Sequence, residues 1–338
     1  MQKRGFLLLL GMAVLLVAAA VYAATSGERA ERVSAGAQRM FPELAARVGD
    51  LAWMRVVHGS LSADFAAIGG DWVVVEKGNY PAAPGRMRSL LRGLADLALL
   101  EPKTRRPELW SRLDLDDPKE GRSTLVMLQS RTGATVAELL VGKTRGDRLG
   151  GTDGVYVRRP GEDQTWLARG SFDLPGDIAG WLDRRIIDIP QSRVASLTLT
   201  AADGARLELR RDAPERGFRV VDAPSDAKLK PDQTMAAPAA ALTELDLADV
   251  RPAAELPSPS RADSSSFQTF DGLTIALKQL ERDKADWIVM AASGTGTAAA
   301  EASALNARFG RWAYAIPADR AKLLRTRLAD VLEPEKGS

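Results

Sequence analysis

The chain contains no cysteine and only one histidine, His58. The absence of cysteine excludes disulfides, thiolate metal ligands, cysteine nucleophiles and a lipoprotein-type anchor. A single imidazole excludes metal sites built from several histidines, and a serine-type catalytic triad would have to use this ring. His58 ends a predicted strand beside Gly59, so we interpret it as an ordinary residue next to a turn.

The sequence also has little net charge. Its 46 basic and 44 acidic residues give a formal charge of +2 and are spread along the chain. Nucleic-acid-binding proteins usually carry a basic face or stripe, so we expect no nucleic-acid partner. With 338 residues, 45% of them hydrophobic, the chain is long enough for about two domains with buried cores.

Nucleotide-binding motifs are incomplete. Gly142-Lys143-Thr144 resembles the end of a phosphate-binding loop, but the first glycine of that motif would fall at Ala137, and no apolar helix follows. We interpret this stretch as a strand that ends in a charged turn. No nucleotide and no other cofactor is expected.

The acidic residues do not point to a particular metal-binding or catalytic site either. Asp114, Asp116 and Asp117 cluster before Pro118 without the spaced oxygens, central glycine and terminal glutamate of a calcium loop. A solvated turn is the preferred interpretation. Paired carboxylates need only be close in space, which leaves four conceivable members of such a pair: Glu76, Glu101, Asp173 and Asp183. We therefore expect no catalytic, cofactor-binding or metal-binding residues and no enzymatic activity.

The N-terminus predicts the compartment. Lys3 and Arg4 precede an uncharged apolar stretch, residues 5–24, and a helix of about 20 residues spans a bilayer's hydrocarbon core. Cations on the short N-terminal side favour a cytoplasmic start and an exported body. The sequence predicts cytoplasmic residues 1–4, a transmembrane anchor at 5–24 and a membrane-proximal spacer at 25–47. The alternative is a cleaved signal peptide; in both cases the body faces the periplasm or extracytoplasmic space, at the inner (cytoplasmic) membrane.

The body begins with short apolar runs typical of antiparallel strands separated by tight turns. One helix is predicted at 84–98, where Met87, Leu90, Leu91, Leu94 and Leu97 recur at helical spacing. A short helix is predicted at 178–182. The predicted strands of this part are 51–58, 61–68, 72–76, 124–128, 135–141, 155–158, 165–168 and 186–189.

The same order of elements then returns. Asp203-Gly204 is a hairpin signal between two predicted strands. In the helix predicted at 231–245, Met235, Leu242 and Leu245 follow Met87, Leu94 and Leu97 at one constant offset. The predicted strands here are 194–200, 206–211, 218–221, 273–277, 287–290 and 312–316, with a mobile loop at 252–266 and a closing helix at 318–332. The fold class is therefore α+β, an internally duplicated unit of antiparallel strands with packed helices, with repeats at 48–190 and 191–334.

Most of the seven tryptophans fall on predicted strand or helix faces, where core packing is the default. Trp110 and Trp181 are flanked by charged residues, which makes these two the best candidates among the seven for a surface groove.

Several motifs together resemble a bacterial family called domain of unknown function 4340. They are Gly70-Asp71-Trp72-Val73, Asn79-Tyr80-Pro81, the stretch 90–97, Glu101-Pro102-Lys103-Thr104, Arg106-Pro107-Glu108-Leu109, Leu140-Val141-Gly142-Lys143, Val155-Tyr156-Val157-Arg158 and the stretch 181–189. The resemblance implies one N-terminal membrane segment and an outward-facing body. It also implies association with the auxiliary component of gliding-motility-type ABC transporters, and it carries no established catalytic residues.

Three functions follow as hypotheses. The first is a membrane-tethered, non-enzymatic interaction or scaffold module, accessory to an ABC-type transport assembly, with an envelope membrane protein as partner. The second is a binding module for an envelope polymer or lipid, which needs an aromatic-lined groove or an apolar tunnel. The third is a hydrolase that uses two carboxylates.

Overall fold

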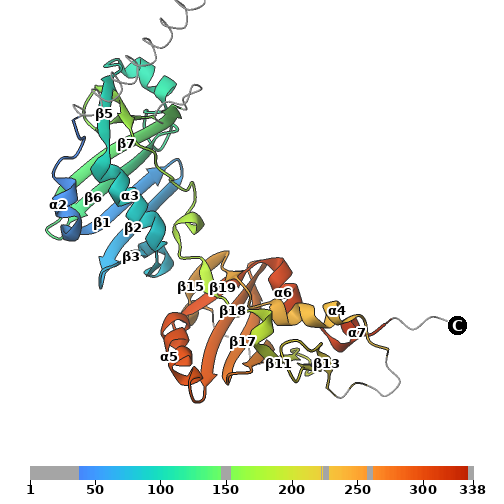
Figure 1. Ribbon diagram of the computed structural model, residues 1–338. Coiled ribbons are helices and arrows are strands. Elements are labelled where there is room, and N and C mark those ends of the chain that lie inside the picture. The colour runs from blue at the N-terminus through green and yellow to red at the C-terminus, as the bar shows by residue number, and fades with distance from the viewer. Residues whose placement is uncertain (1–37, 146–153, 222, 224–227, 257–261, 334–338) are drawn as a thin grey trace, which may run out of the picture. The chain divides into compact units, whose positions relative to one another are not determined.

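The computed structural model of the chain describes residues 38–145, 154–221, 223, 228–256 and 262–333. These residues form two compact units of mixed α+β structure with mostly antiparallel sheets (Figure 1). The first unit holds the described residues up to Val73 together with Pro84–Ile178. The second holds Val74–Ala83 and the described residues from Ala179 onward. The division at Ile178 falls ahead of the predicted junction at residue 190.

The first sheet has nine strands among the described residues, in the order β4-β3-β2-β1-β6-β7-β8-β9-β5. The alternation of buried and exposed residues along β1 and β2 places Met54, Val56, Ala63 and Phe65 in the core. The strands are β1 (Leu51–His58), β2 (Leu61–Ile68), β3 (Asp71–Val74), β4 (Tyr80–Pro81), β5 (Ala98–Pro102), β6 (Thr124–Ser130), β7 (Thr135–Arg145), β8 (Gly154–Arg158) and β9 (Thr165–Arg169).

Helix α3 (Pro84–Asp96) lies across this sheet (Figure 1). Its apolar stripe is buried as the helical spacing predicted, with Met87, Leu90, Leu91 and Leu94 all in the core. The short helical elements of the same part of the chain are α2 (Leu44–Arg47), η1 (Val48–Asp50), η2 (Val75–Lys77) and η3 (Pro107–Leu113). Of these, η2 groups with the second unit.

The second unit contains an eight-stranded sheet in its described part, with the order β13-β12-β11-β16-β17-β18-β19-β15. A separate two-stranded sheet joins β10 (Arg185–Ile187) to β14 (Leu245–Asp246). The large sheet contains β11 (Val194–Thr200), β12 (Arg206–Arg210), β13 (Arg219–Val220), β15 (Asp249–Pro252), β16 (Asp263–Thr269), β17 (Leu273–Arg282), β18 (Ala285–Gly294) and β19 (Trp312–Ile316).

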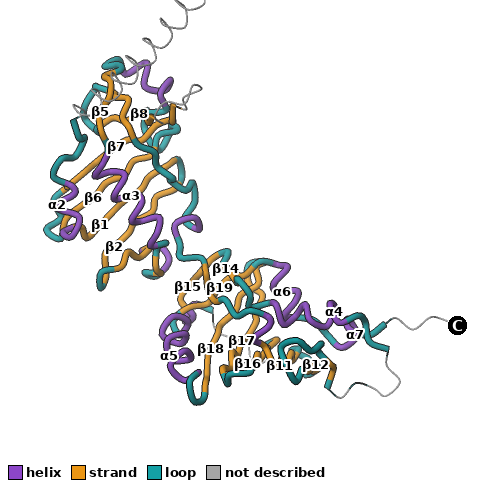
Figure 2. Tube along the Cα trace, in the orientation of Figure 1, coloured by secondary structure: helices purple, strands orange, loops and turns teal. Residues whose placement is uncertain are grey.

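Helices cover one face of this sheet. Figure 2 shows α5 (Ala298–Phe309) beside β18 and shows α4 (Asp232–Ala236), α6 (Ala318–Leu324) and α7 (Leu328–Val331) grouped together. The Gln279 amide on β17 donates to the carbonyl of Ala321 in α6 at 3.4 Å, which ties helix to sheet. Asn306 of α5 exchanges two hydrogen bonds of 2.7 Å with the backbone of Ala292 on β18. The remaining helical elements are η4 (Ala179–Trp181), η5 (Gln191–Arg193), η6 (Ala237–Ala240) and η7 (Ala253–Glu255).

Apart from the edge strand β4, the two large sheets have the same strand order. The remaining strands of the two sheets correspond one by one. The order β3-β2-β1-β6-β7-β8-β9-β5 in the first sheet matches the order β13-β12-β11-β16-β17-β18-β19-β15 in the second, and corresponding strands follow each other in the same sequence along the chain. The pairing register carries the same irregularity in both. A shift between Leu51 and Trp53 on β1 corresponds to one between Val194 and Ser196 on β11. Beyond the shift, Trp53 pairs with Gln129 and Ser196 pairs with Gln268.

Several element predictions need correction. The helix predicted at 231–245 stops early: α4 ends at Ala236 and continues only as the 3-10 turn η6, because Pro238 has no N–H for an α-helical hydrogen bond. The closing helix is interrupted between α6 and α7. The loop predicted at 252–266 is wrong for its last residues, which belong to β16. Residues 257–261 of that loop lie outside the described residues.

In the part of the chain that the structure describes, no helix is long and apolar enough to cross a membrane. The predicted anchor at residues 5–24 lies outside that part.

Candidate functional site

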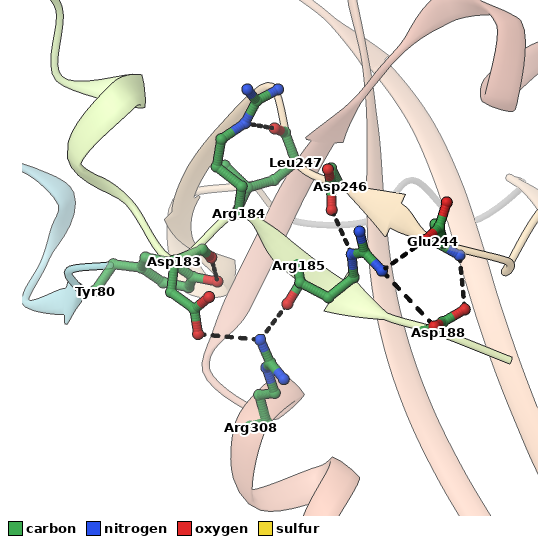
Figure 3. A network of polar contacts seen from close by, with 9 residues as sticks. All are labelled: Tyr80, Asp183, Arg184, Arg185, Asp188, Glu244, Asp246, Leu247 and Arg308. Carbon is green, nitrogen blue, oxygen red and sulfur yellow. Dashed lines mark hydrogen bonds and ion pairs between the residues drawn. The ribbon is translucent and has the colours of Figure 1, made fainter. Parts of the chain in front are cut away.

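A polar network surrounds β10 in the second unit, within the stretch 181–189 that the sequence singled out. The apolar residues of this stretch fix its position, because Leu182, Ile186, Ile187 and Ile189 are all buried. The polar side chains between them are left at the edge of the small sheet, where β10 pairs with β14 through Arg185 and Asp246 (Figure 3). The network therefore follows from a short alternation of apolar anchors and charged residues.

Arg185 is the centre of one half of the network. Its Nε lies 2.6 Å from Asp246 Oδ1, and its Nη1 lies 3.7 Å from Asp188 and 3.9 Å from Glu244 (Figure 3). The hydrogen bond to Asp246 raises the pKa of Arg185 above its usual value. Asp188 also accepts a 2.9 Å hydrogen bond from the backbone N–H of Glu244, so it is held by the backbone as well as by charge.

Arg308 on α5 forms the other half. Its Nη2 is 3.2 Å from Asp183 Oδ2 and also donates to the backbone carbonyl of Arg185 (Figure 3). Arg184 exchanges two further hydrogen bonds with the backbone of Leu247, at 3.3 and 2.8 Å. The guanidinium groups are thus used to join α5 and β14 to the β10 segment.

Tyr80 completes the network from a segment far away in sequence. Its hydroxyl donates to the carbonyl of Asp183 at 3.0 Å, and its ring packs edge-on against Trp312 and Tyr314, with centroids 5.1 and 6.2 Å away. Burial raises the pKa of Tyr80 well above its usual value, and that of Tyr314 likewise. A phenol held neutral in this way orders the backbone and has no role as a base at neutral pH.

The network has the character of a structural clamp. The guanidinium groups of Arg185 and Arg308 pair with carboxylates of the same network, and several of the network's donors form hydrogen bonds to backbone carbonyls. Within the described residues, no group of three or more histidine, cysteine, aspartate or glutamate side chains is placed to hold a metal ion.

The four carboxylates considered for a hydrolytic pair occupy separate elements. Glu101 pairs with Lys103 at 2.6 Å in the first unit, where Asp173 also pairs with Arg86. In the second unit, Asp183 pairs with Arg308 at 3.2 Å and Glu76 lies in η2. Three of the four therefore pair with a cation in their own part of the fold, and none of these pairs joins two of the four carboxylates.

The remaining sequence candidates have structural partners. His58 Nδ1 lies 3.2 Å from the carbonyl of Ser123 and 3.1 Å from the hydroxyl of Thr124, which joins the β1 end to β6. Lys143, on β7, donates to the carbonyl of Arg112. A side chain at Gly142 would approach the carbonyl of Leu113 to 2.2 Å, so this glycine permits η3 to pack on β7. A phosphate-loop role is not needed to explain any of them.

The aspartate cluster forms a turn. Asp117 accepts a 2.8 Å hydrogen bond from the backbone N–H of Lys119, and Asp116 accepts one of 3.3 Å from that of Arg122. Asp114 has a left-handed backbone, with φ of 55°. These are the contacts of a local Asx-type turn.

The expectation that Trp181 lines a surface groove is wrong, because Trp181 is fully buried. It lies in η4, whose carbonyl at Trp181 accepts a 2.8 Å hydrogen bond from Ala83 N–H. Trp110 is half-buried, and the guanidinium of Arg158 covers its ring at 3.6 Å. The cation that covers Trp110 thus comes from a residue far along the chain and not from its charged sequence neighbours.

The structure also brings together residues that sequence reasoning did not single out, notably Arg308, Asp246 and Lys77. Their partners lie far along the chain, as with Arg308 and Asp183, which are 125 positions apart. The one available signal was the charged stretch 183–188 between apolar residues, which marks one side of each contact.

The chain is therefore an α+β protein whose two large sheets share a strand order and whose second unit contains the polar network. The family model described as Domain of unknown function (DUF4340) matches residues 72–264, more than half of the chain, and the chain belongs to this family. The match runs from β3 to β16 and includes every residue of the network except Arg308. The chain matches none of the curated proteins and none of the solved structures with which it was compared.

Proposed function

We propose that this protein is a membrane-tethered, extracytoplasmic interaction module without enzymatic activity, accessory to an ABC-type transport assembly. Residues 5–24 anchor it in the inner membrane, and the two units are copies of one duplicated module that present binding surfaces to an envelope membrane protein. Scaffolding is the mechanism: the anchor sets the orientation, and the sheets supply rigid surfaces.

The observation that carries the proposal is the shared topology of the two sheets. The same strand order and the same register shift near Leu51 and Val194 are difficult to reach independently. Repetition of a rigid module is a common way to build a binding platform. The family match extends across strands of both sheets, which supports the proposal that the two sheets function together.

The way the chain enters the first unit also supports a tether. Leu99 N–H donates to the carbonyl of Gln38 at 2.9 Å, and Met40 N–H donates to that of Leu97 at 2.8 Å. The carbonyl of Met40 accepts a 2.5 Å hydrogen bond from Arg159, and Arg39 pairs with Asp96 at 3.3 Å. In the proposal, residues 25–37 would then limit the distance from the membrane to β5 to roughly 45 Å, at about 3.5 Å per residue.

The contacts of the charged residues favour scaffolding over catalysis. A catalytic acid or base needs a pKa matched to its task and access to substrate. Asp183 is instead paired with Arg308 at 3.2 Å, and Tyr80 is buried with its hydroxyl directed at a carbonyl.

Affinity purification from membranes tests the proposal. The full chain, tagged at its C-terminus and crosslinked in cells before mild detergent extraction, should recover the same ABC-type transporter subunits in repeated experiments. A control chain in which residues 1–24 are replaced by a cleavable signal peptide should be exported, with reduced recovery of the partner. Repeated recovery of no envelope membrane protein would contradict the proposal.

A further inference from the structure

The second sheet has two contrasting faces. Leu197, Phe267 and Ile275 point toward the helices and are completely buried. The alternate residues on the same strands point the other way, and Thr198 and Ser266 on this opposite face are only partly buried. One face is thus a hydrophobic core. The other face is polar over β11 and β16, and an apolar cluster that includes Leu280 and Trp287 covers its part nearer β19.

A hollow of about 430 Å³ lies on the polar face and extends over β11, β16, β17 and β18. Hydroxyl groups line it from two adjacent strands, because Thr198 pairs with Ser266 and Thr200 pairs with Ser264. The next strand contributes Lys278, which is opposite Ser264. The volume is within the range of small-molecule sites, roughly 300–1,000 Å³.

The corresponding face of the first sheet carries larger side chains at matching register positions. Where β11 and β16 pair Thr198 with Ser266, β1 and β6 pair Arg55 with Met127. Where they pair Thr200 with Ser264, the first sheet pairs Val57 with Leu125. Two sheets of one topology therefore differ at this face, and the small hydroxyl residues of the second leave the space.

The charges at the hollow favour an anion. Its lining contains Lys278 and no carboxylate, and Lys278 forms no ion pair with any residue that the structure describes. On the same face, Glu208 of β12 lies opposite Thr198. Glu208 is held by Arg206 at 2.7 Å and Arg210 at 3.8 Å, so this neighbourhood has three cations and one carboxylate.

The side chains that line the hollow also limit which classes of ligand can bind there. It has no aromatic ring on which a sugar or a nucleobase could stack. Four hydroxyl donors and one ammonium group fit an anion with several acceptor oxygens, and lysine is a common phosphate ligand. Ala276, Val289 and Ala291 add a small apolar area beside the donors.

We propose that this hollow binds a phosphate-bearing ligand of small-molecule size. Lys278 supplies the charge, the hydroxyls of Thr198, Thr200, Ser264 and Ser266 donate to phosphate oxygens, and the small apolar residues contact the carbon atoms next to the phosphate. The ligand is either a free phosphate ester or the headgroup of a phospholipid, since both present the same glycerophosphate chemistry. The site goes beyond the scaffolding function and does not depend on it.

Calorimetric titration of the full chain, held in a non-ionic, phosphate-free amphipol, tests the assignment with sn-glycerol 3-phosphate as the probe. Saturable binding is expected, and glycerol without phosphate should not bind. Lys278→Ala and the double variant Thr198→Val/Ser266→Ala should each weaken binding at least tenfold. Lys322→Ala, at an exposed lysine on α6, is the matched control and should bind as the unmodified chain does.

The source of the phosphate is distinguished by a second arm. Vesicles of phosphatidylglycerol that bind through Lys278 when sn-glycerol 3-phosphate alone does not would assign the site to a lipid headgroup. Absence of binding in both arms would overturn the proposal. Equal binding by the chain and by Lys278→Ala, or equal binding of glycerol, would also overturn it.

Discussion

Lys77 and Asp249 lie 172 positions apart in the chain, yet the lysine Nζ is 2.5 Å from the aspartate Oδ1. Both residues belong to the second unit, which includes Val74–Ala83 although this segment contains the last residue of β3 and all of β4. The two side chains are only 21% and 34% exposed. The ion pair joins η2 to β15 and, with Tyr80, holds the Val74–Ala83 segment in place.

Removal of this ion pair should loosen the Val74–Ala83 segment. We expect Lys77→Met or Asp249→Asn to lower the free energy of local opening by about 1 kcal/mol, a value typical of a partly buried pair. Hydrogen exchange of peptides that cover η2 and β15 measures this. The double variant should lose little more than the worse single variant, whereas additive effects would show that the two residues act independently.

Gly78 offers a test with an internal control. Gly78 and Gly69 have nearly the same left-handed φ, 66° and 64°. A Cβ at Gly78 would lie 2.7 Å from the Pro252 ring, while one at Gly69 would meet nothing within 4 Å. Gly69→Ala should therefore cost only the backbone strain, about 1–2 kcal/mol.

Gly78→Ala should cost that strain and the steric displacement of Pro252, so its loss of unfolding free energy should exceed that of Gly69→Ala by at least about 1 kcal/mol. Thermal and urea unfolding of the two variants measure the difference. Equal destabilisation would show that the close approach of Gly78 to Pro252 is not maintained in solution.

The elements with strong patterns were predictable, and those with weak patterns were not. β1, β2 and β11 begin and end at the predicted residues because their turns carry Gly59, Gly69 and Asp203-Gly204. Helix α5 was missed because it is rich in alanine and buries only Ala298, Ala302 and Phe309, so its apolar stripe is faint. β16 was missed because its three consecutive serines have loop composition, although they lie in the middle of the sheet.

The candidate site was harder to predict for a different reason. The sequence places charges between apolar anchors at 181–189, and this indicated one side of the network. It contains no signal for which cation meets which carboxylate, because partners such as Arg308 and Asp183 meet only through tertiary packing. The same limit led to the error on Trp181, whose ring is buried although charged residues follow it in the sequence.

Arg158 is a buried guanidinium whose loss should destabilise the first unit. It is 7% exposed, donates to the carbonyls of Leu115 and Glu162 at 3.2 and 3.1 Å, and stacks on Trp110. Burial lowers the pKa of Arg158 from its usual value. Arg158→Ala should cost about 2–3 kcal/mol through the lost charged hydrogen bonds and ring contact.

Lysine at position 158 should not restore the lost stability, because one ammonium group cannot stack on the ring and reach both carbonyls. Urea unfolding compares Arg158→Ala and Arg158→Lys with the control Arg122→Ala, whose side chain is 83% exposed and whose removal should cost less than about 0.5 kcal/mol. Full recovery of stability in the lysine variant would contradict the stacking role.

Arg193 should make stability depend on pH. Its Nη2 lies 2.5 Å from Glu301 and 2.6 Å from Asp271, and these hydrogen bonds hold the pKa of both carboxyls below their usual values. The stabilisation is therefore complete above the unfolded-state pKa of about 4 and is lost as pH falls through the lower folded-state pKa values.

The melting temperature of the unmodified chain should exceed that of Arg193→Met most at pH 6–7. The difference should shrink on acidification and vanish below about pH 3. A scanning calorimetry series from pH 7 to pH 2.5 checks this. A difference that stays constant over the series would show that Arg193 acts by packing alone.

The absence of cysteine allows the most direct test of the extracytoplasmic body. Ser303→Cys places one thiol on the exposed side of α5, in a chain with no other. A membrane-impermeant maleimide should label this variant in intact spheroplasts as fully as after lysis. Labelling that occurs only after lysis would place the body in the cytoplasm and contradict the proposed tether and its envelope partner together.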